Sequence, residues 1–372
     1  MLDNIKNKKV MVLGNSGFKG AWLSLMLEQL NNEVVGISDK IQWKHGIFNE
    51  NNIKRLKQFW VDIRDLDKIK QIMYKQKPDI IFHLAAQPIV SKSFRNTHLT
   101  FDVNVNGTIN VLEAIRFYDE ECPLVLITTD KVYKNNNNKE KLFKEEDHLF
   151  GDCPYSASKV CCELISSSYS LANPKMRVNI ARSGNVIGGG DWSEDRLIPD
   201  IFKSIMNNKT LLVRNEKSIR PWIHVLDSCL AYLMIGNNML SNKKKYNTFN
   251  IAPLNEEKIT VNEIINMINS LLKTKKLKLL LNKYKEVYPE KKYLRLDPNK
   301  INNHLNWKNF YNIEETIKKT SNWYMNVMEK LDPLTITIDQ ISEYFNLLDI
   351  FKPIIVKNLN TNKILKQHAF NL

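Results

Sequence analysis

The amino-acid sequence predicts an α/β fold: a doubly wound parallel sheet of the Rossmann type with a smaller C-terminal lobe. Short β-branched or apolar runs alternate with longer amphipathic stretches through the first half of the chain, the pattern of parallel strands joined by helices. A glycine-rich turn lies between the first such run and the first such stretch. The length of 372 residues exceeds one average domain and favours two lobes.

The elements follow in order from this alternation. Runs rich in Val, Ile, Leu and Phe predict strands at residues 9–13, 33–37, 59–61, 80–84, 124–128 and 178–183. Amphipathic stretches between them predict helices at 21–30, 66–75, 103–117 and 157–170. Beyond Gly188 the pieces shorten to a helix at 198–207, a strand near Leu211, and helices at 225–236 and 261–272. Residues 135–138 form an Asn run that predicts a mobile surface loop.

These elements divide the chain into three parts. Residues 1–187 are expected to form the Rossmann domain, to which later segments can return. Residues 188–345 are expected to form mainly a substrate-binding lobe, and residues 346–372 a Lys/Asn-rich tail without an assigned role.

Composition excludes several classes of protein. With 43% hydrophobic and 25% charged residues, the chain has ordinary globular usage. No apolar run reaches the roughly 18 residues of a membrane helix, and the N-terminus has no leader pattern, so we expect a soluble cytoplasmic protein without a membrane partner. Five cysteines without a CxxC pair predict reduced thiols and no metal site: Cys122, Cys153, Cys161, Cys162 and Cys229. The net charge of +14 comes mostly from scattered Lys, which favours a solvated surface over nucleic-acid binding.

The glycine-rich turn predicts a dinucleotide site. Gly14, Gly17 and Gly20 follow the first strand and open the first helix, where a pyrophosphate would meet helix N-terminal amides. Asp39 follows the second strand, where a carboxylate accepts hydrogen bonds from ribose hydroxyls. This carboxylate favours NAD over NADP, although the neighbouring Lys40 is a cation that could accept a 2′-phosphate.

Two further groups indicate proton chemistry. Tyr155 and Lys159 are four residues apart at the start of a predicted helix, so both side chains lie on one face. A nearby ammonium and the positive nicotinamide ring of the cofactor are together expected to lower the pKa of the phenol. Thr129, Asp130 and Lys131 follow an apolar strand and are expected at the carboxyl edge of the sheet. An acid beside an amine there can divide two proton transfers between them.

The chain resembles the extended short-chain dehydrogenase/reductases that act on nucleotide sugars, and within them the CDP-glucose 4,6-dehydratase branch. The matching runs are GNSGFKGAWLSL, DIRD, FHLAAQP, NVNGT, TTDKVY, YSASK, RSGNVIGGGDW, DRLIPD and SIRPWIHVLD, with a closing DPLTITIDQISEYF. The family usually has threonine at Leu13 and histidine at Asn15, so we expect Leu13 to loosen the turn.

The resemblance implies the following chemistry. Tyr155 and Lys159 support oxidation at sugar carbon 4, while Thr129 bonds the hydroxyl there. Lys131 then acts as the base at carbon 5 and Asp130 as the acid toward the hydroxyl at carbon 6. Cofactor contacts are implied for Gly14, Ser16, Gly17, Phe18, Gly20, Asp39, Asp62, Ile63, Ala85, Ala86, Gln87 and Asn104. Substrate contacts are implied for Asn185, Arg196 and Arg220.

The resemblance also implies a homodimer formed through the helices at 103–117 and 157–170, and a role in making deoxysugars for surface polysaccharides. Three alternatives stay open: a nucleotide-sugar 4-epimerase, a dehydratase of another nucleotide hexose or heptose, and a catalytically silent dinucleotide-binding protein. His83 and His224 lie in apolar runs and are interpreted as buried structural residues.

Overall fold

Seven parallel strands form the central sheet of the protein. The computed structural model describes residues 1–118, 120–213, 215–242, 246–254, 258–272, 277–281 and 291–350. The sheet has the order β10-β6-β5-β4-β1-β2-β3. Its strands are β1 (Lys9–Leu13), β2 (Glu33–Ser38), β3 (Lys57–Trp60), β4 (Ile80–His83), β5 (Leu124–Thr129), β6 (Val178–Ser183) and β10 (Tyr246–Ile251). The predicted doubly wound α/β fold is confirmed.

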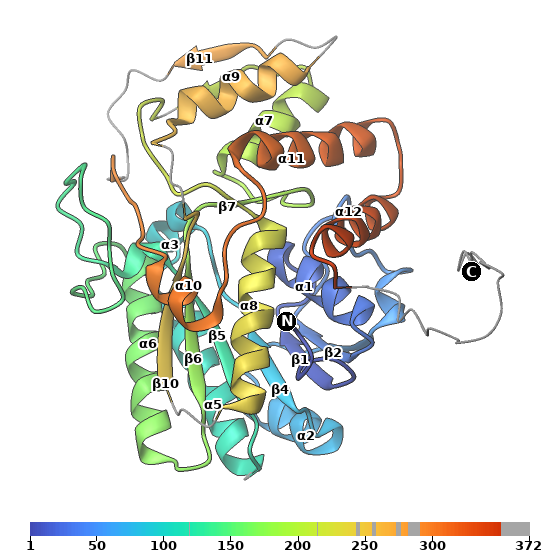
Figure 1. Ribbon diagram of the computed structural model, residues 1–372, viewed down its shortest axis with the longest axis vertical. Coiled ribbons are helices and arrows are strands. Elements are labelled where there is room, and N and C mark those ends of the chain that lie inside the picture. The colour runs from blue at the N-terminus through green and yellow to red at the C-terminus, as the bar shows by residue number, and fades with distance from the viewer. Residues whose placement is uncertain are drawn as a thin grey trace, which may run out of the picture.

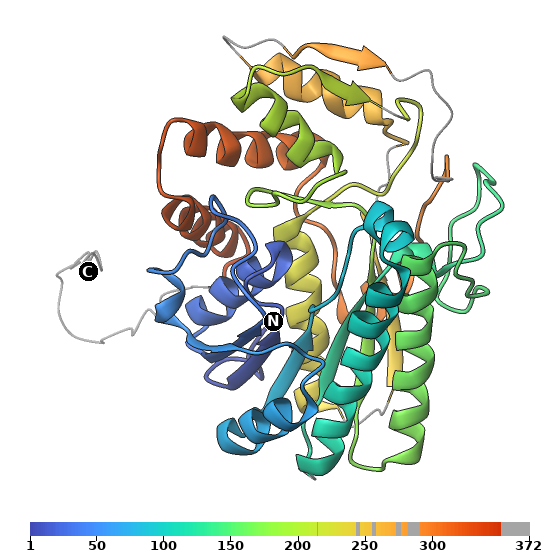
Figure 2. The ribbon, with the colours of Figure 1, turned by 180° about the vertical axis from the view of Figure 1, so that it is seen from behind.

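Helices cover both faces of this sheet. The helices α2 (Leu66–Gln76), α5 (Gly107–Tyr118) and α6 (Pro154–Ala172) lie side by side on one face (Figure 2). The helices α1 (Phe18–Gln29) and α8 (Val225–Ser241) cover the other face, and α12 (Pro333–Leu347) packs against α1 (Figure 1). Side chains alternate along each strand, so Val10 and Val12 enter one apolar core while Met11 and Leu13 enter the other.

The strand order reverses at β1, which pairs with β2 on one side and with β4 on the other. Open α/β sheets bind their ligands at the carboxyl ends of the strands near such a reversal. Gly14 follows β1 and Ala85 comes soon after β4, while Thr129 ends β5. The predicted cofactor and catalytic segments therefore leave neighbouring strands at the same edge.

A smaller group of elements lies at one end of the sheet (Figures 1 and 2). It contains α7 (Leu197–Met206), α9 (Val261–Leu271), α11 (Ile313–Met328) and the parallel pair β8 (Leu211–Val213) and β11 (Leu279–Leu281). A second short pair joins β7 (Val186–Ile187) to β9 (Ile223–His224), and α10 (Asn299–Leu305) contacts β10. From the same part of the chain, α8 and β10 return to the main sheet.

Several observed helices differ from the predicted ones: α6 begins at Pro154 and not at 157, α8 ends at Ser241 and not at 236, and two further differences bear on the site. Helix α1 begins at Phe18, before the predicted residue 21, because Gly20 allows the first turn to pack against Gly14. The helix predicted at 103–117 is divided into a π-helical turn, η2 (Asp102–Asn106), and α5, with α4 (Thr97–Phe101) before them. Two short helices complete the Rossmann domain, η1 (Ile53–Arg55) and α3 (Val90–Arg95).

The Asn run at 135–138 is a loop, as predicted, but part of it is anchored. Asn135 is buried and donates a hydrogen bond to the carbonyl of Tyr293 at 2.7 Å. Of the tail predicted from residue 346, α12 includes the first two residues, and 351–372 lie outside the described residues. Among the described helices, none has the length and apolar content needed to span a bilayer.

Candidate active site

The glycine turn leaves open space at the N-terminus of α1. Gly14 has a φ of +84°, and a Cβ there would lie 2.7 Å from the backbone nitrogen of Ala85. A Cβ on Gly20 would lie 2.1 Å from the Gly14 carbonyl oxygen, whereas one on Gly17 would meet no atom closer than 3.3 Å. Gly14 and Gly20 thus bring helix and strand together. The Gly17 N–H donates to the Gly14 carbonyl at 3.1 Å, and the amides of the first turn of α1 that follow it have no acceptor within the helix. This cradle fits the pyrophosphate of a dinucleotide.

Polar contacts tie this turn to the end of β2. The backbone N–H of Ser16 donates to Ser38 Oγ at 3.1 Å, and Ser16 Oγ donates to the Lys40 carbonyl at 2.6 Å. Asn15 is buried; its amide donates to Gln58 at 2.6 Å and accepts from Ser38 at 2.9 Å. These bonds hold the turn even though Leu13 has no hydroxyl, so Asn15 has a structural role here.

Asp39 borders an open cavity of about 760 Å³ at the ends of β2 and β3. Its lining includes Lys40, Gln58 and Trp60. Asp39 is exposed and accepts one hydrogen bond from Gln42 at 3.0 Å. The carboxylate and the adjoining space fit a ribose with its base, and Lys40 is close enough to interact with a 2′-substituent.

The remaining predicted cofactor residues form the wall of the crevice. Asp62 pairs with Arg64 at 2.7 Å, and this hydrogen bond lowers the pKa of the Asp62 carboxyl. Ile63 is buried and packs so closely on Gly107 that a Cβ there would lie 2.4 Å from its Cδ1. Ala85 and Ala86 are half-buried in the turn after β4.

Gln87 and Asn104 lie behind that turn. Both are buried, and Asn104 Oδ1 accepts from the Gln87 backbone N–H at 2.8 Å. Asn104 Nδ2 donates to Ser158 Oγ at 2.9 Å, and Gln87 Nε2 donates to Thr100 Oγ1 at 2.9 Å. Their side chains therefore hold the turn of Ala85 and Ala86 in place.

The five predicted catalytic residues come together at the carboxyl ends of β5 and the start of α6. Tyr155 and Lys159 are one helical turn apart and both buried. Thr129 shares a hydrogen bond with the Tyr155 phenol, and Thr129 Oγ1 donates to Asp130 Oδ1 at 3.1 Å. Lys131 Nζ donates to the same carboxylate oxygen, also at 3.1 Å. The result is a continuous chain of polar groups from phenol to ammonium.

Asp130 is the most enclosed member of this chain. Its side chain has 0% exposure, whereas that of Lys131 is 31% exposed. The second oxygen of Asp130, Oδ2, has no hydrogen-bond partner among the residues that the structure describes. A buried oxygen without a partner is costly, which favours a ligand hydroxyl at this position.

Without the cofactor, Lys159 is not among the groups that lower the pKa of Tyr155. Burial raises the pKa of Tyr155 to about 12, and the opposing effects come from Thr129 and Arg196. Lys159 Nζ instead donates to the Ile127 carbonyl at 3.3 Å, and burial lowers its own pKa. The phenol therefore stays protonated until another positive charge enters the crevice.

The predicted substrate residues lie in two places. Arg196 pairs with Asp191 at 2.9 Å and lowers the pKa of Tyr155, which places it at the catalytic cluster. Asn185 has a buried Oδ1 without a hydrogen-bond partner in the described part of the chain. Arg220 is buried beside the chain at Lys292, whose carbonyl it contacts at 3.2 Å.

His83 and His224 are buried, as interpreted, but among the described residues each has one ring nitrogen without a hydrogen-bond partner, His83 Nδ1 and His224 Nε2. His83 Nε2 shares a hydrogen bond with Thr108 at 3.2 Å, and His224 Nδ1 accepts from the Leu226 backbone N–H at 3.2 Å. Burial lowers the pKa of both imidazoles to about 3, so each is neutral at physiological pH.

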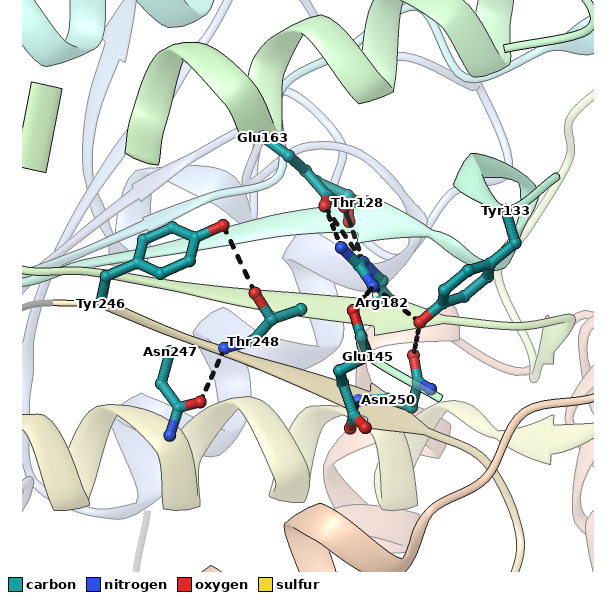
Figure 3. A network of polar contacts seen from close by, with 9 residues as sticks. All are labelled: Thr128, Tyr133, Glu145, Glu163, Arg182, Tyr246, Asn247, Thr248 and Asn250. Carbon is teal, nitrogen blue, oxygen red and sulfur yellow. Dashed lines mark hydrogen bonds and ion pairs between the residues drawn. The ribbon is translucent and has the colours of Figure 1, made fainter. Parts of the chain in front are cut away.

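A buried polar network that sequence reasoning missed supports the catalytic strand from behind (Figure 3). Glu163 on α6 pairs with Arg182 on β6 at 2.5 Å, and the two side chains are 1% and 3% exposed. Thr128 Oγ1 donates to Glu163 at 2.6 Å, and Arg182 donates to the Tyr133 hydroxyl at 2.7 Å. Tyr133 then donates to Asn250 on β10 at 2.6 Å. The network thus connects the elements that carry Thr129 and Lys159.

Replacing Arg182 with methionine is expected to destabilise the protein by about 3–5 kcal/mol, because it leaves the buried Glu163 charge without its partner. Urea unfolding of the wild type and the variant measures this difference in free energy. The matched control is Arg116→Met, which breaks the exposed pair with Glu113 and is expected to cost about 0.2–1 kcal/mol. Equal losses in the two variants would contradict the structural role of the network.

The sequence of this chain is similar to those of known sugar-nucleotide enzymes. Residues 11–320 match the family model described as GDP-mannose 4,6 dehydratase. The chain is 35% identical to CDP-glucose 4,6-dehydratase of Salmonella typhimurium over 92% of its own length and 97% of that protein.

Two solved structures share the fold. The dTDP-glucose 4,6-dehydratase of Bacillus anthracis, in complex with NAD, has a TM-score of 0.72 at 24% identity, covering 88% of this chain and 99% of that one. The UDP-glucose 4-epimerase of Thermotoga maritima, with UDP-glucose, has a TM-score of 0.76 at 19% identity, covering 86% and 99%.

Proposed function

The chain belongs to the GDP-mannose 4,6 dehydratase family, and we propose that it is an NAD-dependent hydro-lyase that converts CDP-glucose to CDP-4-keto-6-deoxyglucose and water. It is a homologue of CDP-glucose 4,6-dehydratase over nearly its whole length. The observation that carries the proposal is the continuous chain Tyr155, Thr129, Asp130, Lys131, which contains a phenol for oxidation and an acid–amine pair for elimination. The exposed Asp39 carboxylate favours NAD over NADP.

The side chains divide the reaction among them. NAD, held by the glycine turn before α1 and by Asp39, would supply reversible hydride chemistry at carbons 4 and 6. Tyr155 takes the proton of the hydroxyl at carbon 4, which Thr129 holds by a hydrogen bond. Oxidation at carbon 4 makes the proton at carbon 5 acidic, and the amine of Lys131 removes it. Asp130 donates a proton to the hydroxyl at carbon 6, which departs as water. The protonated Lys131 then returns a proton to carbon 5 when carbon 6 is reduced.

The positions of the acid and the base suit these tasks. Asp130 is enclosed and has one carboxyl oxygen without a protein partner in the described structure, so it can face the departing hydroxyl. Lys131 is partly exposed, and its Nζ lies 3.1 Å from Asp130. Transfer of a proton from Lys131 to Asp130 within this pair leaves a neutral amine to act at carbon 5 and a carboxylic acid to act at carbon 6. Asn185, Arg196 and Arg220 are proposed to bind the nucleotide diphosphate.

A 4-epimerase is the second candidate, because the fold is shared with an epimerase of solved structure. Such an enzyme oxidises carbon 4 and returns hydride to the opposite face without losing water. It has no use for the acid–amine pair of Asp130 and Lys131, which favours the dehydratase.

Incubation with CDP-, dTDP-, UDP- and GDP-hexoses, followed by mass measurement, tests the function. CDP-glucose is expected to lose one water. A product of unchanged mass but inverted carbon 4 would identify an epimerase, and loss of water from another nucleotide sugar alone would change the assigned substrate. No change with any of the four would favour a catalytically silent dinucleotide-binding protein.

We also propose that the protein is a homodimer, paired through α5 and α6. Leu164 and Leu171 are seven residues apart on one face of α6 and are 60% and 75% exposed, and Phe117 on the adjacent α5 is 58% exposed. Exposed large apolar side chains on neighbouring helices favour a protein interface at this place.

The double variant Leu164→Asp, Leu171→Asp is expected to be monomeric because two buried charges would oppose association. Light scattering after gel filtration measures the mass. The control Leu331→Asp, at an exposed position outside these helices, should remain dimeric. A monomeric wild type would contradict the proposal.

A further inference from the structure

Residues 188–196 connect the end of β7 to the start of α7, and of them only Arg196 has a part in the steps above. This segment, GGGDWSEDR, is called the strap below. Residues 188–193 are buried, whereas Glu194 and Asp195 are exposed. The strap therefore has a packed end and an open end.

The packed end is fixed on the side of β1 and β2. Trp22 on α1 donates a hydrogen bond from Nε1 to the Gly189 carbonyl at 2.9 Å. Trp192 Nε1 donates to the carbonyl of His45, in the loop after β2, at 2.7 Å. A Cβ on Gly189 would lie 1.9 Å from the Trp323 ring, so this end of the strap has no room to move.

The open end is held from the other side, by α3 after β4. Ser91 on α3 is buried, and its Oγ donates a hydrogen bond to Asp195 Oδ2. Arg95 Nη2, on the same helix, lies 3.9 Å from that oxygen. Asp195 has a φ of +57°, a left-handed conformation that aspartate adopts more readily than most residues. The contact between Ser91 and Asp195 is called the latch below.

The partners of the two ends show that the strap crosses the crevice. In the main sheet β1 lies between β2 and β4, and the crevice opens at the carboxyl ends of β1 and β4. The packed end is bound from α1 and the loop after β2, and the open end from α3. Figure 1 shows α3 and β7 at the same end of the sheet. Arg196 follows Asp195 and is among the groups that lower the pKa of Tyr155, so the latch lies at the catalytic end of the crevice.

The proposed reaction requires a closed site at this end. Loss of water leaves a 4-keto sugar with a double bond between carbons 5 and 6. This unsaturated sugar becomes the product only when carbon 6 receives the hydride and carbon 5 a proton. If it escaped earlier, the enzyme would keep a reduced cofactor with no sugar to receive the hydride. Closure also keeps water away from the reactive double bond.

We propose that Asp195 is a positioning residue whose hydrogen bond with Ser91 keeps the strap closed over the unsaturated sugar until carbon 6 is reduced. The proposal rests on the proposed function and adds to it the retention of this intermediate. The Asp195 side chain is 38% exposed, unlike the packed end of the strap. The latch can therefore open when the nucleotide sugar enters and form again once it is bound.

Single-turnover reactions of CDP-glucose with the wild type and with Ser91→Ala test the latch. The variant removes the hydrogen-bond donor and leaves the sequence of the strap unchanged. In the wild type, the absorbance of reduced nicotinamide should rise and then decay. In the variant, the fraction that persists should be about tenfold larger, the effect of losing one hydrogen bond to a carboxylate. Mass analysis should then detect a free sugar nucleotide that is lighter than the product by two hydrogen atoms.

Variants of the strap separate the hydrogen bond from backbone freedom. Asp195→Gly suits the positive φ and removes the carboxylate, so it should match Ser91→Ala, and the double variant should be no worse than either. Asp195→Asn keeps an acceptor oxygen and should restore most of the wild-type retention. The matched control is Glu194→Gly, which introduces glycine at the exposed neighbouring position and should behave as the wild type.

Amide hydrogen exchange of the ligand-free protein gives a reading that does not depend on activity. Exchange at residues 191–196 should be faster in Ser91→Ala than in the wild type, because the open end of the strap is released. Asp195→Asn should exchange at close to the wild-type rate. Equal exchange in Ser91→Ala and the wild type would refute the latch.

The outcomes of the turnover experiment separate this proposal from the proposed function. If the wild type removes water from no nucleotide sugar, the proposed function fails and the retention role fails with it. If the wild type turns over and Ser91→Ala accumulates no additional reduced nicotinamide, the latch is refuted while the dehydratase assignment stands. Slower oxidation without accumulation would also refute it, because Ser91 would then serve binding and not retention.

Discussion

Replacing Tyr155 with phenylalanine is expected to lower the turnover of CDP-glucose by about 10²–10⁴-fold, the usual contribution of a positioned acid or base. The change removes one oxygen atom and keeps the buried ring, so the fold should be preserved. It also removes the hydrogen bond with Thr129, and with it the path by which the proton of the hydroxyl at carbon 4 leaves.

The pH dependence of the wild-type rate of oxidation indicates which protonation state of Tyr155 is active. A base acts in its deprotonated form, and burial raises the pKa of Tyr155 to about 12 in the ligand-free protein. The rate of oxidation at carbon 4 should therefore increase with pH across the neutral and alkaline range, and this increase should be absent in the variant. The positive charge of NAD⁺ would shift the rise to lower pH.

Turnover is measured by mass analysis of the product, and oxidation at carbon 4 by the absorbance of reduced nicotinamide. Tyr169→Phe is the matched control, because Tyr169 lies on the same helix but bonds Glu113 at 2.8 Å on the outer side. Its activity should equal that of the wild type. An unchanged rate in Tyr155→Phe would exclude the phenol as the base.

Most of the main sheet was predictable because strands such as β1 and β4 are buried and therefore read as apolar runs, whereas β3 at the sheet edge has the partly exposed sequence KQFW. The strand at residues 178–183 was predicted with its observed bounds, and that at 9–13 likewise. The return of β10 to the sheet was not predicted as a strand, because YNTFNI alternates polar and apolar residues and pairs with β6 at the edge of the sheet.

The π-helical turn η2 could not be read from local sequence. The run at 102–106, DVNVN, consists of weak helix formers and has no local sign of a wider turn. The turn coincides with long-range contacts: Asn104 reaches Gln87 and Ser158, 17 and 54 residues away. The widened turn carries the Asn104 side chain that secures the wall of the crevice.

Those parts of the candidate site whose residues are close in sequence were predictable. Ion pairs between residues that are distant in sequence were less so, because only tertiary structure brings them into contact. The spacing of Tyr155 and Lys159 predicted that they share one helix face. The direction in which the pKa of Tyr155 shifts depends on how deeply the phenol is buried, which no motif reveals. Glu163 could have been found, because it lies one helical turn after Lys159 and therefore shares its buried face. Its partner Arg182 lies in an apolar strand, and only tertiary structure brings the two together.

Replacing Lys131 with alanine is expected to separate oxidation from elimination. Tyr155 and Thr129 remain in place, so the sugar should still be oxidised at carbon 4 and reduced nicotinamide should accumulate on the enzyme. The amine that takes the proton from carbon 5 is lost, so formation of the 4-keto-6-deoxy product should slow by about 10²–10⁴-fold. Mass analysis should detect a 4-keto sugar that has retained its water.

Deuterium oxide makes this test specific for the base. In the wild type, solvent deuterium should enter the product at carbon 5, whereas in Lys131→Ala the oxidised sugar should keep its original hydrogen there. Lys134→Ala is the matched control, because Lys134 is exposed three residues further along the chain and should behave as the wild type. If the variant exchanges carbon 5 at the normal rate, another group is the base, and the 3.1 Å contact between Lys131 and Asp130 serves only to orient the acid. The dehydratase would then depend on Asp130 alone for the proton transfers after oxidation, with the carboxylate first removing the proton at carbon 5 and then donating it to the departing hydroxyl.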